Sequence, residues 1–267
     1  MLTFTKMNGA GNDFVMVDNR DGSAQLTREQ IARLCDRHRG VGGDGLLAVE
    51  APQNGADFRM RYYNADGGEA EMCGNGARCF ARFASRLAGR TDAVSFETIA
   101  GVITATLLGD RVQLKMSVPK DLAPAANLSA AGELVSVNFV NTGVPHAVVV
   151  TNTLDAVDIV KLGSAIRWHE HFAPKGTNAN FIQVLGPASL AIRTYERGVE
   201  DETLACGTGV VASALIHNQI TGAPSPIGVR VKGGDILEVG FERTGDAYSN
   251  VTLTGPADFV FDGKVEV

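Results

Sequence analysis

The chain has 267 residues, with 24 Lys or Arg against 30 Asp or Glu, so its formal net charge is −6. An acidic chain is a poor match for nucleic acid or for an anionic membrane, because both bind basic surfaces. The sequence has no run of about 18 apolar residues that could span a membrane, and its start lacks the basic and apolar segments of a signal peptide. We therefore expect a cytoplasmic globular protein with one large domain or two smaller ones.

Glycine and cysteine are the informative residue types. Glycine makes up 31 of 267 residues, or about 12%, against about 7% in average proteins. The four cysteines are Cys35, Cys73, Cys79 and Cys206. They form no Cys-x-x-Cys pair, which excludes a zinc ribbon or a thioredoxin-type motif. In a reducing compartment we expect thiols rather than disulfides.

Taken in chain order, the first half predicts two helices and a set of short strands. Thr27 is a suitable N-cap for a helix over residues 28–38. The alternating run 59–64 predicts a strand that leads through a polar turn to Cys73. Apolar side chains then recur at helical spacing until Gly89, a typical C-cap. Further strands are predicted over residues 93–98, 102–108 and 111–116.

The second half follows a similar order. An irregular stretch is predicted over residues 117–133, and then a helix around residues 155–168. A strand is predicted over residues 191–197, before a helix that follows Cys206 and stops at Gly222. Three strands come after it, over residues 228–231, 236–241 and 248–253.

The two halves share a Cys-Gly-x-Gly motif. Cys73-Gly-Asn-Gly76 and Cys206-Gly-Thr-Gly209 lie 206 − 73 = 133 residues apart, which is half of the chain. A strand and a polar turn precede each motif, and a helix followed by strands comes after it. Several matches in the same order indicate a duplicated domain. The sequence thus predicts two α+β domains, each with many short strands and one principal helix.

Each of these two cysteines falls directly before the first turn of its helix. The first backbone N–H groups of a helix lack intrahelical partners, and the helix dipole favours negative charge there. Such a position lowers the pKa of a thiol and can hold a carboxylate or a developing oxyanion. If the two domains face each other, one thiolate can remove a proton from an α-carbon and the opposing thiol can return one to the other face. The matched cysteines therefore point to cofactor-free racemisation or epimerisation.

The other thiol, histidine and arginine groups favour structural roles. Cys35 and Cys79 lie within apolar helical stretches and are interpreted as core residues. His169 and His171 are two positions apart and do not share a helix face, so no metal site is expected. Four arginines recur at every fourth position and are interpreted as a solvated helix face: Arg78, Arg82, Arg86 and Arg90.

Six segments together carry a family resemblance. They are KMNGAGNDF (6–14), YNAD (63–66), MCGNGARC (72–79), GTNANF (176–181), YERG (195–198) and ETLACGTG (202–209). In this order they resemble the diaminopimelate epimerase family over essentially the whole chain. The resemblance implies an isomerase that converts LL-2,6-diaminopimelate to the meso form in lysine and peptidoglycan precursor biosynthesis. It also implies that neither pyridoxal phosphate nor metal takes part.

The fold implied by the resemblance is α+β, with two pseudo-symmetric domains. Each is a mixed or antiparallel strand layer wrapped around a central helix, with the active site in the interdomain cleft. The N-terminal epimerase domain would cover residues 1–117 and be completed by the last strand, about 256–267. The C-terminal epimerase domain would cover residues 118–255. Diaminopimelate is the implied small-molecule partner, and because the family is commonly dimeric, a homodimer is one candidate assembly.

The resemblance also implies roles for single residues. Cys73 and Cys206 would be the acid/base pair. The reacting carboxylate and amine would be held by Asn12, Gly74, Asn75, Gly207 and Thr208. The distal amino-acid head would be bound by Asn64, Asn178, Glu196 and Arg197. His146 and Glu196 would assist catalysis.

Two positions depart from the family pattern. Val144 stands where many members carry Asn, and Gly45 where some carry Gln, which leaves open whether substrate contacts are rearranged or substrate choice is widened.

Three alternative functions stay open. They are a two-cysteine racemase for proline-like substrates, a binding module that holds an amino acid at the helix ends, and a redox-sensing cysteine pair. Asn178, Glu196 and Arg197 would have no clear role with proline. The presence of both cysteines and of the residues for both polar heads of the substrate argues against a binding module.

Overall fold

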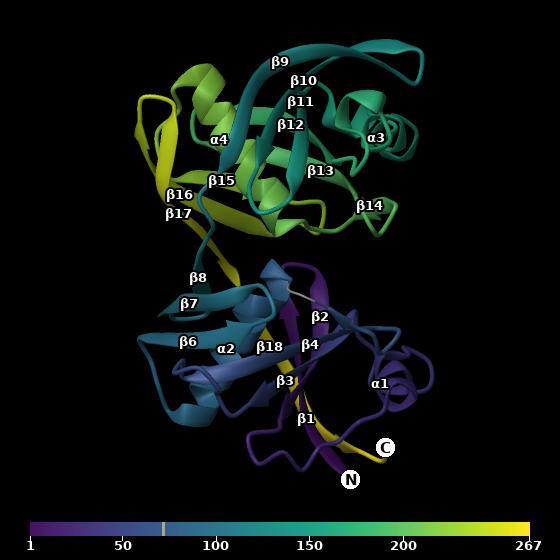
Figure 1. Ribbon diagram of the computed structural model, residues 1–267, viewed down its shortest axis with the longest axis vertical. Helices are drawn as coiled ribbons and strands as arrows, with labels where there is room; N and C mark the ends of the chain where they lie inside the picture. Colours follow the sequence, from purple (N-terminus) through teal and green to yellow (C-terminus); the bar gives the residue numbers. More distant parts are fainter. Residues whose placement is uncertain (71–72) are drawn as a thin grey trace. The chain divides into compact units, whose positions relative to one another are not determined.

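The structure is a computed structural model that describes residues 1–70 and 73–267. Contacts between residues divide the chain into two compact units. Unit 1 comprises Met1–Lys115 and Gly255–Val267, and unit 2 comprises Met116–Thr254. In each unit short strands surround one long helix (Figure 1), which confirms the predicted α+β class with a central helix in each half.

Unit 1 is a run of paired strands around the helix α2. The strands pair in the order β18-β1-β2-β3-β4-β6-β7-β8, in which β2–β3 and β4–β6 are parallel and the other pairs are antiparallel. The short β5 pairs with β4. The elements are β1 (Leu2–Gly9), β2 (Asn12–Asp18), α1 (Arg28–Cys35), β3 (Gly45–Glu50), β4 (Phe58–Asn64), β5 (Glu69–Ala70), α2 (Gly74–Ala88), β6 (Ala93–Thr98), β7 (Gly101–Leu108), β8 (Arg111–Lys115) and β18 (Asp258–Val265).

Unit 2 is built in the same way around the helix α4. Its strands pair in the order β9-β10-β11-β12-β13-β15-β16-β17, in which β11–β12 and β13–β15 are parallel. The elements are β9 (Lys120–Ala130), β10 (Glu133–Asn141), β11 (Pro145–Val150), η1 (Leu154–Ala156), α3 (Ile159–Arg167), η2 (Glu170–Phe172), β12 (Asn178–Gly186), β13 (Ser189–Glu196), β14 (Asp201–Thr203), α4 (Gly207–Thr221), β15 (Ile227–Arg230), β16 (Ile236–Thr244) and β17 (Ala247–Pro256).

The two units repeat one pairing pattern, in agreement with the duplication seen in the sequence. Counted from β18 in unit 1 and from β9 in unit 2, the third and fifth strand pairs are parallel and the others are antiparallel. The first strand of the series is supplied differently in the two units. It comes from the end of the chain in unit 1 and from the start of the unit in unit 2.

The two central helices also begin and end alike. Each has 15 residues, starts after a cysteine in extended conformation and ends at a glycine with left-handed backbone, Gly89 at φ 65° and Gly222 at φ 71°. Glycine adopts this conformation without steric cost, so it is a common residue at the C-terminal end of a helix. The predicted starts and ends of both helices are confirmed. In α4, Val210, Val211 and Ile216 are all buried, because strands cover the helix on several sides.

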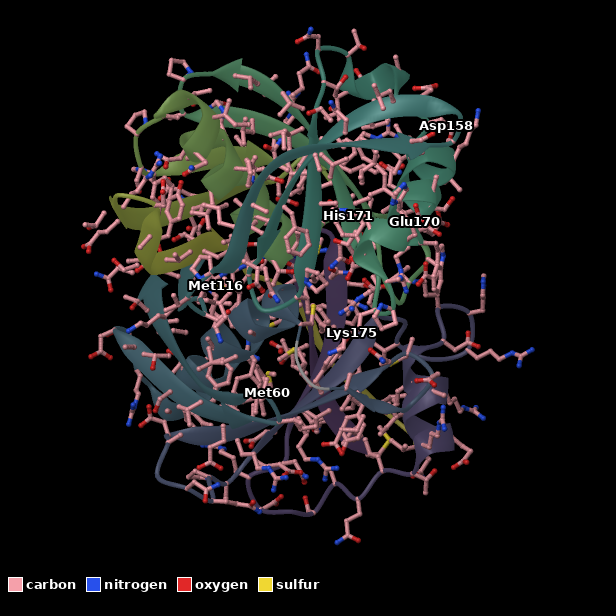
Figure 2. All side chains as sticks on the ribbon, turned by 45° about the horizontal axis from the view of Figure 1, so that its top comes forward. Met60, Met116, Asp158, Glu170, His171 and Lys175 are labelled. Carbon is pink, nitrogen blue, oxygen red and sulfur yellow. The ribbon has the colours of Figure 1, made fainter. Side chains whose placement is uncertain are left out.

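Two other predicted helices are shorter than expected. Thr27 caps α1 as predicted, through a capping box with Gln30, but α1 ends at Cys35 because Asp36 is already extended. The helix predicted around residues 155–168 is split into η1 and α3. Asp158 caps α3 by accepting a hydrogen bond from the N–H of Lys161, so a new helix begins there; Figure 2 labels Asp158 beside it.

The irregular stretch predicted over residues 117–133 was wrong for most of its length. Residues 120–130 form β9, which pairs with β10. Pro124 lies between the paired residues Ala123 and Ala126, where the register of the two strands shifts. A proline is tolerated at such a bulge because no N–H is needed there for the ladder. Over residues 1–70 and 73–267, no helix is both long and apolar enough to cross a membrane.

Candidate active site

Each unit contains one helix that begins directly after a cysteine, and these two helix starts carry the candidate catalytic residues. Cys73 precedes α2 with φ −129° and ψ 125°, and Cys206 precedes α4 with φ −123° and ψ 106°. The carbonyl of Cys73 accepts from the N–H of Ala77 at 2.7 Å, and the carbonyl of Cys206 accepts from Val210 at 2.9 Å. The three N–H groups before each of these donors belong to the positive end of the helix dipole. Each unit therefore has a cysteine at a helix end where the backbone favours negative charge.

In unit 1, two amides at the start of α2 are held in fixed orientations. Asn75 donates through Nδ2 to Oδ1 of Asn12 at 2.6 Å, and Asn12 donates through Nδ2 to Oδ2 of Asp44 at 2.8 Å. Arg37 donates to Oδ1 of Asp44 at 2.8 Å, and Arg78 donates to Oδ1 of Asn75 at 2.9 Å. Charged groups at both ends thus determine which way each amide points. The predicted site residues Asn12 and Asn75 are in direct contact.

A carboxylate anchors the turn that carries Asp44. Burial alone would raise the pKa of Asp13, but hydrogen bonds from Arg37 and Lys6 outweigh it and lower this pKa to about 2. The ionised Asp13 accepts the backbone N–H of Asp44 at 3.2 Å. Asn64, the other predicted amide of unit 1, is exposed at the end of β4. Its N–H donates to the carbonyl of Gly68 at 2.9 Å.

In unit 2, the side chain of Asn178 is hydrogen-bonded to Arg197, which is also predicted to bind the distal head. Its Nδ2 donates to the carbonyl of Pro145 at 2.9 Å, and its Oδ1 accepts the N–H of Arg197 at 2.9 Å. The guanidinium of Arg197 donates to the carbonyl of Lys175 at 3.4 Å (Lys175 is labelled in Figure 2). One N–H of the Asn178 amide and most of the Arg197 fork are left by these bonds for other acceptors.

Glu196 and Cys206 are both largely covered by protein, and each lies next to a threonine hydroxyl. The Oε2 atom of Glu196 accepts from the hydroxyl of Thr203 at 2.9 Å. Burial raises the pKa of Glu196, with the hydrogen bond from Thr203 acting against it. Cys206 is 8% exposed, and its Sγ lies 3.6 Å from Oγ1 of Thr208. The predicted residues Cys206 and Thr208 are therefore neighbours in the structure as well as in the sequence.

His146 is wholly buried in β11, next to β12. Its Nδ1 lies 3.1 Å from Nδ2 of Asn180. Burial, followed by the positive charge of Arg197, lowers the pKa of His146 to about 3, so the imidazole is neutral at pH 7. Its Nε2 has no hydrogen-bond partner among the described residues.

The other two cysteines are in the core, as interpreted from the sequence. Burial raises the pKa of the Cys35 thiol to about 11 and that of the Cys79 thiol to about 12, which makes both poor nucleophiles at neutral pH. The interpretation of the arginine stripe as a solvated face was wrong for Arg78, which is 0% exposed. The face of α2 that carries Arg78 is covered by the chain around Gly9 and Pro256, whose carbonyls accept hydrogen bonds from it.

Comparison with known proteins decides the family. The family model described as diaminopimelate epimerase matches residues 4–120 and 138–260. The chain belongs to the diaminopimelate epimerase family. Its relatives include the diaminopimelate epimerase of Aquifex aeolicus, 41% identical over 99% of this chain and 98% of the relative. The diaminopimelate epimerase of Chlorobaculum tepidum is 43% identical over 97% of this chain and 99% of the relative. The resemblance predicted from the six segments is confirmed.

More distant solved structures share the fold of this diaminopimelate epimerase family member. A phenazine biosynthesis protein of the PhzF family from Bacillus anthracis has a TM-score of 0.73 at 16% identity, covering 100% of this chain and 99% of that one. A probable proline racemase from Agrobacterium radiobacter has a TM-score of 0.67 at 16% identity, covering 100% of this chain and 93% of that one. At this identity the likeness concerns the fold alone.

Sequence reasoning missed the residues that orient the predicted ones. Asp44 lies in the glycine-rich turn Gly42-Gly-Asp-Gly45, a signal that was available but has no specific meaning by itself. Asn180 follows Asn178 by two positions in a strand, so the two side chains lie on one face of the sheet, which could have marked it. Thr203 carries no local signal, because its role depends on the pairing of β13 with β14.

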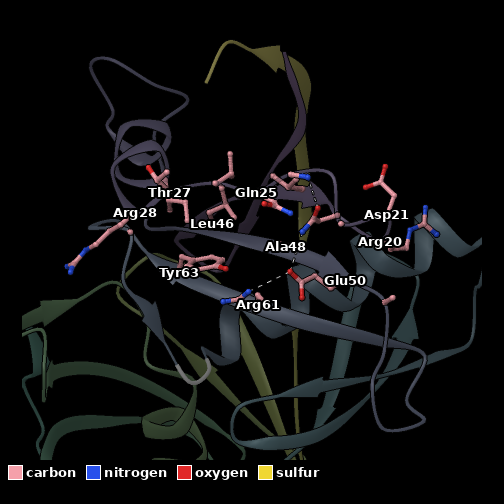
Figure 3. A pocket seen from close by; sticks show the side chains of 18 of the residues that line it. Arg20, Asp21, Gln25, Thr27, Arg28, Leu46, Ala48, Glu50, Arg61 and Tyr63 are labelled. Carbon is pink, nitrogen blue, oxygen red and sulfur yellow. Dashed lines mark hydrogen bonds and ion pairs between the residues drawn. The ribbon is translucent and has the colours of Figure 1, made fainter.

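A separate cavity of about 890 Å³ lies in unit 1 and contains none of the predicted site residues. It is lined by β3, β4 and the loop before α1 (Figure 3). Arg61 in its wall pairs with Glu69 at 2.8 Å and lies 3.9 Å from Glu50. Because these charges pair with each other, we assign no ligand to it. In the described part of the chain, no three His, Cys, Asp or Glu residues are grouped as metal ligands would be.

Proposed function

We propose that the chain interconverts LL- and meso-2,6-diaminopimelate by moving one α-proton between Cys73 and Cys206. Membership of the diaminopimelate epimerase family, at 41–43% identity over nearly the whole chain, supports the activity. The observation that carries the mechanism is the pair of 15-residue helices, each preceded by a cysteine. In this proposal the two units are the two epimerase domains, and both helix ends serve one substrate molecule.

The helix ends would bind the reacting carboxylate. The backbone N–H groups of Gly74 and Asn75 in one unit, and of Gly207 and Thr208 in the other, would donate to its oxygens. Negative charge grows on this carboxylate when the α-proton leaves, so donors and dipoles already aimed at it lower the barrier. Asn12, held by Asn75 and Asp44, would lie close to the reacting amine.

The proton transfer balances without a cofactor. The thiolate of one cysteine takes the α-proton, so the C–H bond breaks, an S–H bond forms, and the electron pair is left on the α-carbon and its carboxylate. The thiol of the other cysteine then gives its proton to the opposite face, so that S–H bond breaks and a new C–H bond forms with inverted configuration. Because the pair shares one proton, the reverse reaction begins from the other cysteine.

The distal head of the substrate would be recognised by Asn64, Asn178, Glu196 and Arg197. Arg197 can pair with the distal carboxylate in a bidentate manner, and Asn178 keeps one N–H for it. Glu196 can accept from the distal ammonium, and Asn64 adds an amide. Glu196 and the neutral His146 would also assist the thiols. Such recognition of a second amino-acid head distinguishes this substrate from proline.

The proposal extends to the setting of the enzyme. The reaction belongs in the cytoplasm, where lysine and peptidoglycan precursors are made, and a homodimer is the assembly that the family favours.

The decisive experiment is α-hydrogen exchange in deuterated water, with LL- and meso-diaminopimelate as substrates and proline as a control. We expect inversion of diaminopimelate with uptake of one deuteron at the α-carbon, no added cofactor, and no reaction of proline. Cys73→Ala should lose the interconversion, whereas Cys35→Ala, which removes a buried thiol of the same unit, should keep it. Full activity of Cys73→Ala, or turnover of proline alone, would overturn the proposal.

A further inference from the structure

The buried imidazole of His146 is in contact with the side-chain amide of Asn180. We propose that Asn180 is a positioning residue that holds His146 as the neutral tautomer with its proton on Nε2, so that this N–H can donate to a negatively charged acceptor. The catalytic consequence rests on the proposed function, but the tautomer can be observed independently of it.

The neighbours of Asn180 determine which way its amide points. Asn180 is wholly buried; its Nδ2 lies 3.0 Å from the carbonyl oxygen of Ala147, and its Oδ1 lies 3.1 Å from the hydroxyl of Thr194. A carbonyl oxygen can only accept, so the NH2 group must face Ala147. The hydroxyl of Thr194 then donates to Oδ1. The reverse orientation would set two acceptors against each other.

The same NH2 group determines the tautomer of His146. It lies 3.1 Å from Nδ1 of the imidazole, and an amide NH2 can only donate. Nδ1 must therefore contribute its lone pair, and the single proton of the neutral ring is on Nε2. An imidazolium would bring two donors together at a fully buried position, where charge is also disfavoured by desolvation.

The Nε2–H group is the part of His146 that the protein leaves for another molecule or state. It is buried and has no hydrogen-bond partner among the described residues. Buried N–H groups are almost always paired, so this one calls for an acceptor. An anionic acceptor suits it best, either a thiolate or the carboxylate of a bound amino acid. His146 would thus stabilise negative charge as a donor and would not act as the base that removes a thiol proton.

Asn180 is also packed against the helix start that carries Cys206. A Cβ atom placed on Gly209 would lie 2.4 Å from Oδ1 of Asn180 and 3.4 Å from Sγ of Cys206. Glycine is therefore required at the first turn of α4 to let the amide approach. The residue that sets the tautomer and the turn that holds the thiol are in one packed cluster.

The test is nitrogen-15 NMR of the histidine rings in the full-length protein, with the signals of His146 identified by their loss in His146→Gln. We expect a protonated Nε2 and an unprotonated Nδ1 in the wild type. In Asn180→Asp, the near-isosteric carboxylate accepts from Nδ1, so the proton should appear there and kcat should fall by about 10²-fold or more, with a smaller change in KM.

Thr194→Val is the matched control. It removes the hydroxyl that donates to Asn180 but leaves the amide facing His146, so the Nε2–H tautomer should persist. Asn180→Ala removes the donor altogether and should give a mixture of both tautomers, which keeps the test available if Asn180→Asp does not fold. A wild-type ring protonated at Nδ1, or an Asn180→Asp protein with the Nε2–H tautomer and kcat within twofold, would overturn the inference. An inactive wild type with the expected tautomer would instead contradict the proposed function.

Discussion

Arg78 ties three separate segments of unit 1 to the central helix. Its guanidinium donates to the carbonyls of Gly9 at 3.1 Å and Pro256 at 3.2 Å, and to Oδ1 of Asn75 at 2.9 Å. It therefore holds the end of β1, the returning C-terminal chain and one of the amides beside Cys73. A buried arginine is stable only when its donors are used in this way.

We expect Arg78→Met to lower the free energy of unfolding by about 3 kcal/mol or more, because buried acceptors lose their donor and each such loss costs about 1–3 kcal/mol. Urea unfolding measures the change. Arg90→Ala is the control; Arg90 lies just beyond the end of α2, is half-exposed and pairs with Asp57 at 2.7 Å. An exposed pair of this kind contributes less than about 1 kcal/mol. Equal losses for the two variants would show that Arg78 is not the structural link described here.

At the scale of the element, two glycines have opposite requirements: Gly9, the last residue of β1, which packs against α2, and Gly74, the first residue of α2. A Cβ atom on Gly9 would lie 2.7 Å from the carbonyl oxygen of Asn75 and 2.9 Å from Sγ of Cys79, so β1 and α2 need glycine there to pack. Apart from its chain neighbours and the backbone of its own helix, no described atom would lie within 4 Å of a Cβ atom on Gly74. The packing of the described chain therefore gives no reason for glycine at position 74, whereas close approach of a substrate carboxylate does.

Substitution of the two glycines by alanine should therefore have different effects on stability. Gly9→Ala should destabilise the protein by about 1–3 kcal/mol, because the added methyl group has no room. Gly74→Ala should leave the stability unchanged or raise it by up to about 1 kcal/mol, since alanine is the better helix former. The same variant should lose at least about tenfold in epimerisation rate. Urea unfolding and the exchange assay separate the two effects, and a Gly74→Ala protein with full activity would refute the binding role.

The arginines that follow Arg78 on α2 fasten β18 to unit 1. Arg82 donates to the carbonyl of Ala257 at 2.7 Å, and Arg86 pairs with Asp262 at 3.0 Å. Both guanidinium groups also lie over the ring of Phe259, at 5.0 Å and 4.2 Å from its centroid. A stripe that resembles a solvated face in the sequence is thus one side of the contact between the central helix and the last strand.

At the scale of the whole molecule, one pattern of strand pairing is used twice, and only the supply of the first strand differs. In unit 2 the first strand is β9, which directly precedes β10 in the chain. In unit 1 the first strand is β18, the last strand of the chain. Completion of unit 1 therefore requires a contact between residues more than 250 positions apart, such as Thr5 with Asp262. Long-range pairing of this kind closes a large loop before it is stabilised, which slows folding.

The stability of the whole chain should depend on pH through His146. Its pKa is about 3 in the folded state and about 6.5 when unfolded, so between these values the unfolded state binds more protons. The part of the free energy of unfolding that depends on His146 is then at its full value above pH 6.5. It falls as the pH is lowered, by about 2 kcal/mol between pH 7 and pH 5. Asp13 does not contribute between pH 7 and pH 5. Its pKa is about 2 in the folded state and 3.8 when unfolded, so its contribution to stability is lost only when the pH falls below 3.8.

His146→Gln should remove this part of the pH dependence, and urea unfolding of both proteins at pH 7 and pH 5 measures it. Glu196, whose pKa is raised by burial, acts in the opposite direction but is present in both proteins and cancels in the comparison. Equal slopes for the wild type and His146→Gln would show that the buried imidazole is not held neutral in the folded state.

The amino-acid sequence by itself determined the central helices and the family. A cysteine followed by Gly-x-Gly, and a glycine sixteen residues after that cysteine, specify a helix start and end through local backbone preferences, which need no distant partner. The repeat of this motif after 133 residues revealed the duplication, and the ordered segments identified the family. The roles of Cys73 and Cys206 remain predictions from the same local pattern.

Only the tertiary structure decided how long-range contacts use the remaining residues. Residues 120–130 are a strand because β10 lies beside them, although Pro119 and Pro124 favour irregular chain. Arg78 is buried because β1 and the C-terminal segment cover it, and the helical spacing of the arginines contains no information about that cover. The orientation of Asn180, and with it the tautomer of His146, depends on a carbonyl and a hydroxyl from neighbouring strands. Such properties arise from groups that the fold brings together, so local preference cannot predict them.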